Sequence, residues 1–289
     1  MVPPSVLASM FPTQQSQNKA PPKSAHCGKK GAKHPRKIGK KGSKDSQEPL
    51  TPQSVLMDIL QQRGYNVTRI KSDDAEYDAV PSPLQLASFG THLVRAVHTS
   101  DVELLTSLLK CGLSSNPCNQ FRDSIVDLVC KRANESIFAC LLENGCDLQT
   151  VDGFGRTPLH HCCWASTFSQ SIAETIIQKD PVQLFIEDKH GQTPLEYVRA
   201  DLYGEWIEFL ERTADTYWPE GGETPKVKSP KEKRPDGLLP DPPNAISVTL
   251  AAMVSSGQVT PKQVEEMDEN TKKTYNKKKQ THSYNIVSA

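Results

Sequence analysis

Acidic residues are absent from the first 44 positions of this 289-residue chain, although ten lysines and arginines lie there. The whole chain carries 34 basic and 34 acidic residues. The N-terminal segment therefore has a net charge of about +10 and the rest of the chain one of about −10. These opposite charges predict attraction between the two parts.

Long apolar runs are absent as well. No stretch approaches the roughly 18 consecutive apolar residues of a membrane span, and residues 1–12 are too short and too broken by proline for a secretory signal. We therefore expect a soluble intracellular protein of the nucleus or cytoplasm, with no membrane partner. Organelle import stays open because transit peptides also lack acids, although such peptides favour arginine and an amphipathic helix over lysine and proline.

The N-terminal part of the chain divides into two regions. Residues 1–50 are rich in Pro, Lys, Gly, Ser and Gln, and they predict a disordered basic tail because they bury too little apolar surface to offset the entropy of ordering. Residues 51–78 predict a short amphipathic helix followed by an acidic linker. In this helix Thr51 is the expected cap, Pro52 the first helical residue and Gly64 the stop signal.

The remaining chain also divides in two. Residues 79–218 form the expected main domain, which contains an internal repeat. Residues 219–289 mix Pro, Lys and Glu and predict a low-complexity, mostly disordered region. Short helices are expected within it over 245–254 and 260–267.

The internal repeat has a period of 33 residues. Thr91, Ser124 and Thr157 are spaced by 33, and Thr193 follows three residues late. A pair of bulky apolar residues returns once in each unit, at Leu108-Leu109, Leu141-Leu142, Ile176-Ile177 and Phe209-Leu210. Each unit thus predicts a first helix that begins at the Thr or Ser and a second helix that carries the apolar pair. Four stacked units bury a continuous core.

Two stretches resemble the ankyrin consensus, in which a turn with glycine precedes Thr-Pro-Leu-His. They run from Asp152-Gly153-Phe154-Gly155-Arg156 to Thr157-Pro158-Leu159-His160 and from Asp188-Lys189-His190-Gly191-Gln192 to Thr193-Pro194-Leu195. The two earlier units follow the register more than the motif. The chain therefore resembles the ankyrin-repeat family, with four repeats over about residues 79–218.

The resemblance implies an all-α fold, an ankyrin-repeat solenoid of helix-turn-helix units with β-hairpin fingers, flanked by disordered tails. Proteins of this family generally act as binding scaffolds, although a fold alone does not fix a function. We expect a non-catalytic scaffold or adaptor, a monomer that binds an unidentified protein partner through its finger tips and concave face.

The finger tips correspond to Gln120-Phe121, Gly153-Phe154 and Lys189-His190. Phe121, Phe154 and His190 are therefore candidate protein contacts. Two interpretations of the phenylalanines stay open. The rings form an exposed hot spot on adjacent fingers, or they fold back onto their own hairpins as small apolar clusters.

The concave positions correspond to His98-Thr99, Lys131-Arg132, Trp164-Ala165 and Ala200-Asp201. Among them, Trp164 and Arg132 are the preferred anchors for a partner. Because Trp164 precedes a longer loop at 165–169, packing beneath this loop is the alternative interpretation.

Consecutive His160, His161, Cys162 and Cys163 suggest zinc at first sight. Successive helical residues point in different directions, so at most His160 and Cys163 share a face, two ligands short of a closed site. The cysteines occupy small-residue positions of the repeat, and the resemblance gives His160 a turn-supporting role. With no glycine-rich phosphate loop and no convergent nucleophile and base, we expect no metal, no cofactor and no catalytic residue. The eight cysteines are expected to stay reduced.

The N-terminal tail holds eight cations within sixteen residues: Lys29, Lys30, Lys33, Arg36, Lys37, Lys40, Lys41 and Lys44. This run predicts contact with an import receptor or with nucleic acid, electrostatic and salt-sensitive because no aromatic residues are interleaved. The alternative function is therefore a nuclear or chromatin-associated regulator. A solubilising tail, or one that docks on the acidic repeats of the same chain, stays open too.

Overall fold

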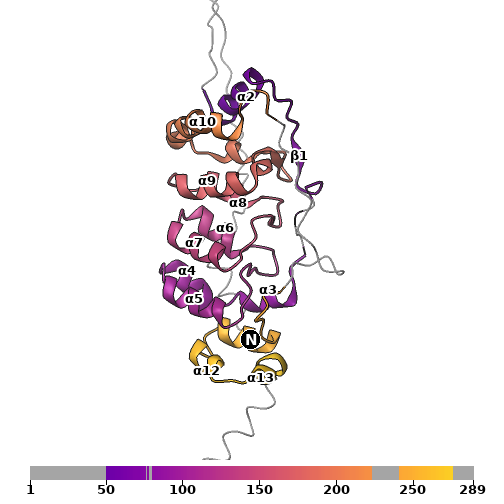
Figure 1. Cartoon of the computed structure of the whole chain (residues 1–289), viewed down its shortest axis with the longest axis vertical. Helices are drawn as coiled ribbons and strands as arrows, with labels where there is room; N and C mark the ends of the chain where they lie inside the picture. Colours follow the sequence, from indigo (N-terminus) through magenta and orange to yellow (C-terminus); the bar gives the residue numbers. More distant parts are fainter. Residues whose placement is uncertain (1–49, 76, 78–79, 223–240, 276–289) are drawn as a thin grey trace, which may run out of the picture. The chain divides into compact units, whose positions relative to one another are not determined.

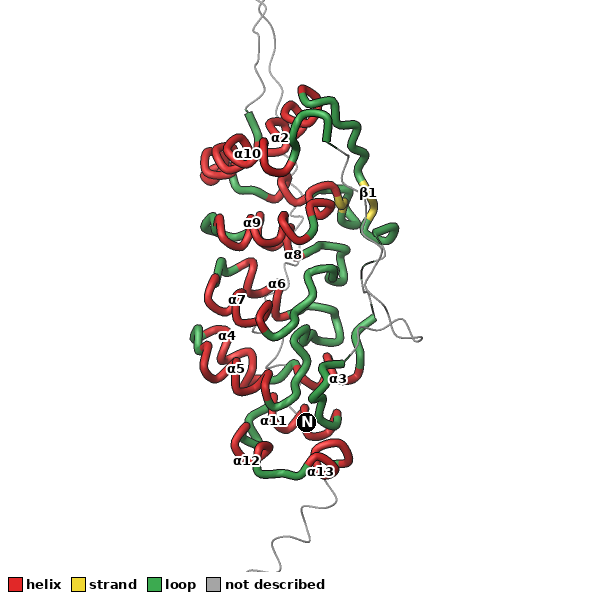
Figure 2. Tube along the Cα trace, viewed as in Figure 1, coloured by secondary structure: helices red, strands yellow, loops and turns green. Residues whose placement is uncertain are grey.

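Helices make up nearly all of the regular structure. A computed structural model of the protein describes residues 50–75, 77, 80–222 and 241–275. Within these residues, the only strands are β1 (Ile70–Lys71) and β2 (Ile186–Glu187), which pair in parallel. The chain is therefore all-α, as predicted (Figure 2).

No helix in the described part of the chain combines the length and the apolar character that crossing a bilayer requires.

Four successive units occupy residues 91–217. The first three pair two helices each: α4 (Thr91–His98) with α5 (Val102–Lys110), α6 (Ile125–Lys131) with α7 (Glu135–Glu143), and α8 (Pro158–Cys163) with α9 (Gln170–Lys179). First helices pack on first helices of the neighbouring unit, and second helices pack on second helices (Figure 1). The apolar pairs of the repeat face this core. Leu108, Ile176, Ile177 and Leu210 are fully buried, and Leu142 is half-buried.

The fourth unit departs from the other three. Its first helix is the single 3₁₀ turn η2 (Pro194–Tyr197), which ends where Val198 adopts an extended backbone with ψ of 133°. A second short 3₁₀ turn, η3 (Ala200–Leu202), leads into α10 (Tyr203–Tyr217). A further 3₁₀ helix, η1 (Pro181–Phe185), lies between the third and fourth units, where the repeat period lengthens.

The first helices begin at capping boxes. Ser124, Thr157 and Thr193 each exchange hydrogen bonds with the residue three positions later. Such a box pairs backbone N–H groups that the first helical turn would leave unsatisfied. The expected helix starts are confirmed in all four units, although α4 begins at Thr91 after Gly90 without a side-chain cap.

The predicted N-terminal helix is confirmed as α2 (Pro52–Gln62), with Thr51 in a capping box and Gly64 in the left-handed conformation after it. This helix packs on α10 and η2, so it covers the fourth unit. Leu56 and Leu60 are buried there. Arg63 donates to the carbonyl oxygen of Trp218 at 2.8 Å and holds the α2 end against α10.

The expected acidic linker is in part a packed segment. Buried Ala75 and Tyr77 form a cluster with Val182 and Ile186, and the Tyr77 hydroxyl donates to a carboxylate oxygen of Asp180. The linker prediction was wrong for these residues, because burying their apolar side chains stabilises the packed arrangement.

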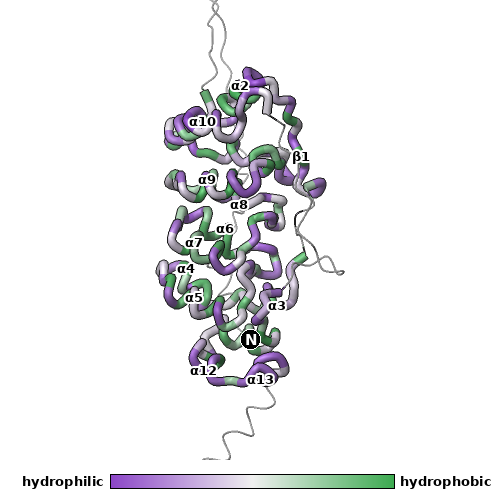
Figure 3. The backbone as a smooth tube through the Cα atoms, in the orientation of Figure 1, coloured by the Kyte–Doolittle hydropathy of each residue, from purple (hydrophilic) through white to green (hydrophobic). Residues whose placement is uncertain are grey.

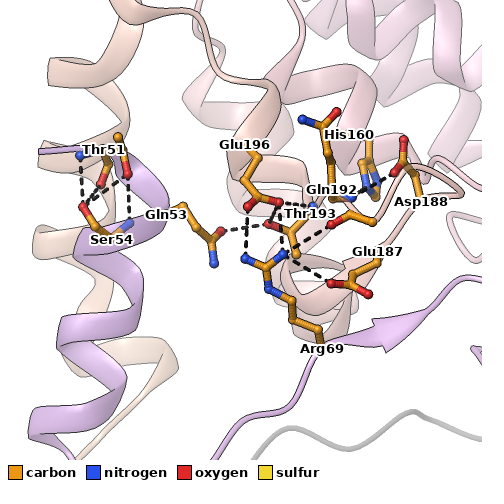
Figure 4. A network of polar contacts seen from close by, with 11 residues as sticks. Thr51, Gln53, Ser54, Arg69, His160, Glu187, Asp188, Gln192, Thr193 and Glu196 are labelled. Carbon is orange, nitrogen blue, oxygen red and sulfur yellow. Dashed lines mark hydrogen bonds and ion pairs between the residues drawn. The ribbon is translucent and has the colours of Figure 1, made fainter. Parts of the chain in front are cut away.

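Polar contacts tie the same N-terminal flank to the fourth unit (Figure 4). Arg69 forms ion pairs with Glu196 at 3.0 Å and Glu187 at 3.2 Å. The Thr193 hydroxyl donates to Oε1 of Gln53 in α2 at 2.9 Å. The flank is therefore held both at the capping box of η2 and at β2.

The C-terminal region was predicted to be mostly disordered, which is wrong for residues 241–275. They form α11 (Val248–Ser255), α12 (Pro261–Glu265) and α13 (Glu269–Thr274), close to the short helices that were expected. The sequence did not indicate that these helices pack. Their apolar residues make packing favourable: Ile246, Leu250, Ala251, Val254, Val259 and Val264 are all buried.

Helix α11 packs on α4 and on α3 (Pro83–Ser88), a short helix before the first unit. Ser255 donates its hydroxyl to the Ala87 carbonyl oxygen at 2.7 Å. Gly90 lies so close to the Ser255 backbone that a Cβ atom would clash with it. The C-terminal flank therefore covers the first unit.

The two flanks thus cover opposite ends of the series of units (Figures 1 and 2). The N-terminal flank covers the fourth unit, and the C-terminal flank covers the first. Figure 3 shows hydrophobic residues along α5, α6 and α7 and hydrophilic ones along the segment around β1. Covering both terminal units removes the exposed apolar faces that a series of packed units otherwise leaves.

Candidate functional site

Three hairpin turns, before the second, third and fourth units, share one hydrogen-bond pattern. In the third unit, Oδ1 of Asp152 accepts the backbone N–H groups of Phe154 at 2.8 Å and Arg156 at 2.9 Å. Asn119 and Asp188 accept the corresponding two N–H groups of the other turns. Because each side chain satisfies two backbone donors, it fixes the two tip residues between them.

Aromatic side chains at these tips lie in solvent. Phe121 is 67% exposed and Phe154 is 52% exposed, and His190 is exposed as well. The Phe154 and His190 rings stack with centroids 6.3 Å apart. The phenylalanines are thus not buried in their own hairpins, and Phe154 rests on the neighbouring turn.

A second set of residues lies at the ends of the four first helices, and we call it the first-helix column: His98, Lys131, Trp164 and Tyr197. The four positions are 33 residues apart. The Lys131 Nζ atom lies 3.8 Å from the centroid of the Trp164 ring. The Trp164 and Tyr197 rings are 5.6 Å apart. Trp164 is therefore a half-buried centre of the column, in contact with Lys131 and Tyr197.

Arg156 connects the third turn to the column. Its guanidinium lies 4.7 Å from the Phe154 ring and 5.1 Å from the Trp164 ring. Asp152 holds it through an ion pair of 2.7 Å. Although burial opposes ionisation of Asp152, hydrogen bonds and charge from His161 and Arg156 hold the pKa of its carboxyl well below the usual range. Arg156 is therefore a fixed cation between two aromatic rings.

Neighbouring arginines act on the two basic members of the column. Burial, together with the nearby Arg156 charge, lowers the pKa of Lys131, and Asp123 acts against this effect. Burial and the Arg132 charge lower the pKa of His98. Both shifts have one consequence: an added negative charge at this surface would favour the protonated forms of Lys131 and His98.

Two of the expected concave anchors are placed differently by the structure. Arg132 is exposed at the C-cap of α6, and the neighbouring Lys131 lies on Trp164 in its place. In the fourth unit, Tyr197 joins the column where Ala200-Asp201 were expected, because η2 is a single turn; Asp201 pairs with Arg199 at 2.9 Å. Lys131 was among the expected concave positions. The spacing of 33 from Trp164 could also have identified Tyr197, but Thr193 follows three residues late in the sequence and so pointed to residues 200–201.

The consecutive histidines and cysteines of α8 have structural contacts. His160 Nδ1 lies 3.0 Å from the Thr157 backbone nitrogen, and Nε2 lies 3.1 Å from the Gln192 carbonyl oxygen of the next turn. Burial raises the pKa of the Cys162 thiol to about 12 and that of the Cys163 thiol well above its ordinary value. The cysteines therefore behave as small apolar residues.

The basic-tail candidates, Lys29 to Lys44, lie outside the described residues.

A comparison of the chain with models of protein families gives no match. A comparison with curated proteins also gives no relative. The geometry of the hairpin turns and the first-helix column is therefore the basis for the function.

Proposed function

We propose that this chain is an ankyrin-repeat protein and that it works as a non-catalytic scaffold for another protein. The proposal of the family is supported by the repeated hairpin turn with its Asn or Asp, the capping box that follows, and the two stretches that resemble the consensus. The paired first and second helices in the described units agree with a solenoid of such repeats.

One observation carries the proposed binding role. Exposed aromatic rings at the tips continue, through Arg156, into the half-buried Trp164 and Tyr197 of the column. Solvent-exposed aromatic residues that are already fixed by neighbours lose little side-chain entropy on binding, and Trp, Tyr and Arg are the residues enriched in binding hot spots. This surface is thus suited to macromolecular recognition.

The titratable residues of the same region favour binding over chemistry. Asp152 and Asp188 each accept two backbone N–H groups within their turns, and His160 bridges two units. Groups engaged in this way are not free to exchange protons with a substrate. We therefore assign Asp152, Asp188 and His160 a structural role.

Affinity capture with the full chain tests the proposal. Phe154→Ala and Trp164→Ala should each lose a protein that the wild type retains, while Glu143→Ala, at an exposed position on the second helix α7, should keep it. Thermal unfolding of all variants checks that the surface changes leave the fold intact. If both aromatic variants keep every captured protein, the surface assignment is wrong.

A second candidate function rests on the ten cations and missing acids of residues 1–44, which favour contact with nucleic acid. Binding of duplex DNA is compared for the full chain and a deletion of 1–44 at two salt concentrations. A salt-dependent loss on deletion supports this role, and equal binding rules it out.

A further inference from the structure

The column carries a lysine whose charge is not neutralised by a neighbouring acid. Among the described residues no carboxylate forms an ion pair with Lys131, and its ammonium group lies on the Trp164 ring. Lys131 is exposed to solvent apart from this contact with the ring. An anion can therefore reach its charge from the solvent side.

The acids closest to this surface are already engaged. Asp152 pairs with Arg156 and accepts two backbone N–H groups. Asp188 accepts the Tyr197 hydroxyl and two backbone N–H groups of its own turn. Asp123 accepts the side-chain amide of Asn119 at 2.8 Å. Rotating Asp152 or Asp188 toward Lys131 would break the backbone bonds of their turns, and rotating Asp123 would break its bond to Asn119. An anion supplied by a partner carries no such cost.

The side chains around Trp164 also determine which charge a ligand must carry. Two cations of the chain, Lys131 and Arg156, already lie near the Trp164 ring. A cation can stack favourably on a tryptophan ring. Here, however, Lys131 and Arg156 would repel a lysine or arginine of the partner. The same argument excludes the basic N-terminal tail of this chain as the occupant.

A peptide fits better than a nucleic acid. Carboxylates flank the fourth unit at the end of the column, where Glu187, Glu196 and Asp201 form ion pairs. A phosphate backbone carries a charge at every step and requires a continuous basic track. A peptide can place single acids beside Lys131 and Arg132 and an apolar side chain against Trp164 and Tyr197.

We propose, building on the function above, that the partner presents an acidic peptide segment to the first-helix column, with a carboxylate at Lys131 and an apolar side chain on Trp164. Charge-assisted contact at Lys131 supplies specificity for acids, and the Trp164 ring supplies apolar area. Phe154 and His190 extend the same surface at the finger tips.

Selection from a phage library of random 12-residue peptides on the full chain supplies the probe. Sequences enriched in Asp or Glu together with an aromatic or aliphatic residue are expected. Enrichment of neutral or basic sequences, or no enrichment, would overturn the proposal. Because the basic tail also attracts acids, the decisive readout is the difference between variants that all keep the tail.

Fluorescence anisotropy then compares the selected peptide on wild type, Lys131→Glu and Lys110→Glu. Lys110, exposed at the end of α5, gives the same change of net charge away from the column. We expect binding to weaken at least about tenfold for Lys131→Glu and to change less than about twofold for Lys110→Glu. Equal losses in both variants, or tighter binding of duplex DNA that Lys131→Glu abolishes, would refute the acidic-peptide assignment.

Two outcomes distinguish an error about the chemistry of the partner from an error about the scaffold role. If acidic peptides bind both variants equally while Trp164→Ala still loses a captured protein, the scaffold role holds and only the chemistry of the partner is wrong. If Trp164→Ala and Phe154→Ala also keep every captured protein, both proposals fail.

Discussion

The second and third units have the same backbone plan and different side chains at corresponding positions. The second unit has Arg122 and Asp127 where the third has Gly155 and His160, although both carry a phenylalanine at the tip. Both form the hairpin turn and the capping box. Local backbone bonding therefore sets the unit, and the side chains decide what is added to it.

The capping residue illustrates the difference. His160 satisfies the cap with one ring nitrogen and reaches the Gln192 carbonyl oxygen of the next unit with the other. Asp127 satisfies the cap with Oδ2, whereas its buried Oδ1 has no hydrogen-bond partner among the described residues. The third unit is thus bonded to its successor where the second has an unsatisfied acceptor.

The largest effect is expected from His160→Ala. The change removes the cap, the bond between units and a fully buried ring, so the free energy of unfolding should fall by about 3 kcal/mol. Urea unfolding measures it. Asp127→Ala is the matched change in the second unit and should cost clearly less, because it also removes a buried carboxyl; equal costs would break the comparison.

The next effect on stability is expected from a substitution of Gly155. Arg122 adopts a φ of 69°, so the turn itself tolerates a side chain, but a Cβ atom on Gly155 would clash with buried Ser72 of the N-terminal flank. Gly155→Ala should lower the free energy of unfolding by about 2 kcal/mol. Gly191→Ala, at the same turn position with a φ of 77° and open space around it, should cost about half as much.

The last effect is the pH dependence of stability that Asp127 causes. Burial raises the pKa of Asp127 to about 6, against a partial offset from His161 and Ser124. An acid with a raised pKa in the folded state binds its proton more tightly there, so its contribution to stability falls as the pH rises from about 4 to about 6. Asp127→Asn should therefore gain about 2 kcal/mol of stability relative to wild type between pH 4 and pH 7. Urea unfolding at both pH values measures the difference, and a constant difference would contradict it.

Sequence reasoning reached the features that repeat. The spacing of 33 gave the units and the helix starts at Ser124 and Thr157, because short-range hydrogen bonds recur wherever the motif does. The resemblance to ankyrin repeats implied the tips at Phe121 and Phe154 and the concave position of Trp164. The structure adds that Lys131, and not Arg132, lies on the Trp164 ring.

The flanks could not be placed in this way. The apolar residues of α2 and α11 indicate helices, but nothing local to them says that α2 packs on the fourth unit and α11 on the first. Likewise, Tyr197 enters the column only because Val198 ends η2 after one turn. Contacts between residues far apart in sequence depend on shape and packing, which leave no periodic signal.

Photo-crosslinking in cells tests the central claim, that the aromatic surface meets another protein. The photoreactive amino acid benzoylphenylalanine replaces Phe154 in one sample and exposed Glu143 of α7 in another. We predict a discrete crosslinked protein from position 154 that is absent from position 143 and is lost when Trp164→Ala is added. Equal crosslinking at both positions, or none at 154, would contradict the account.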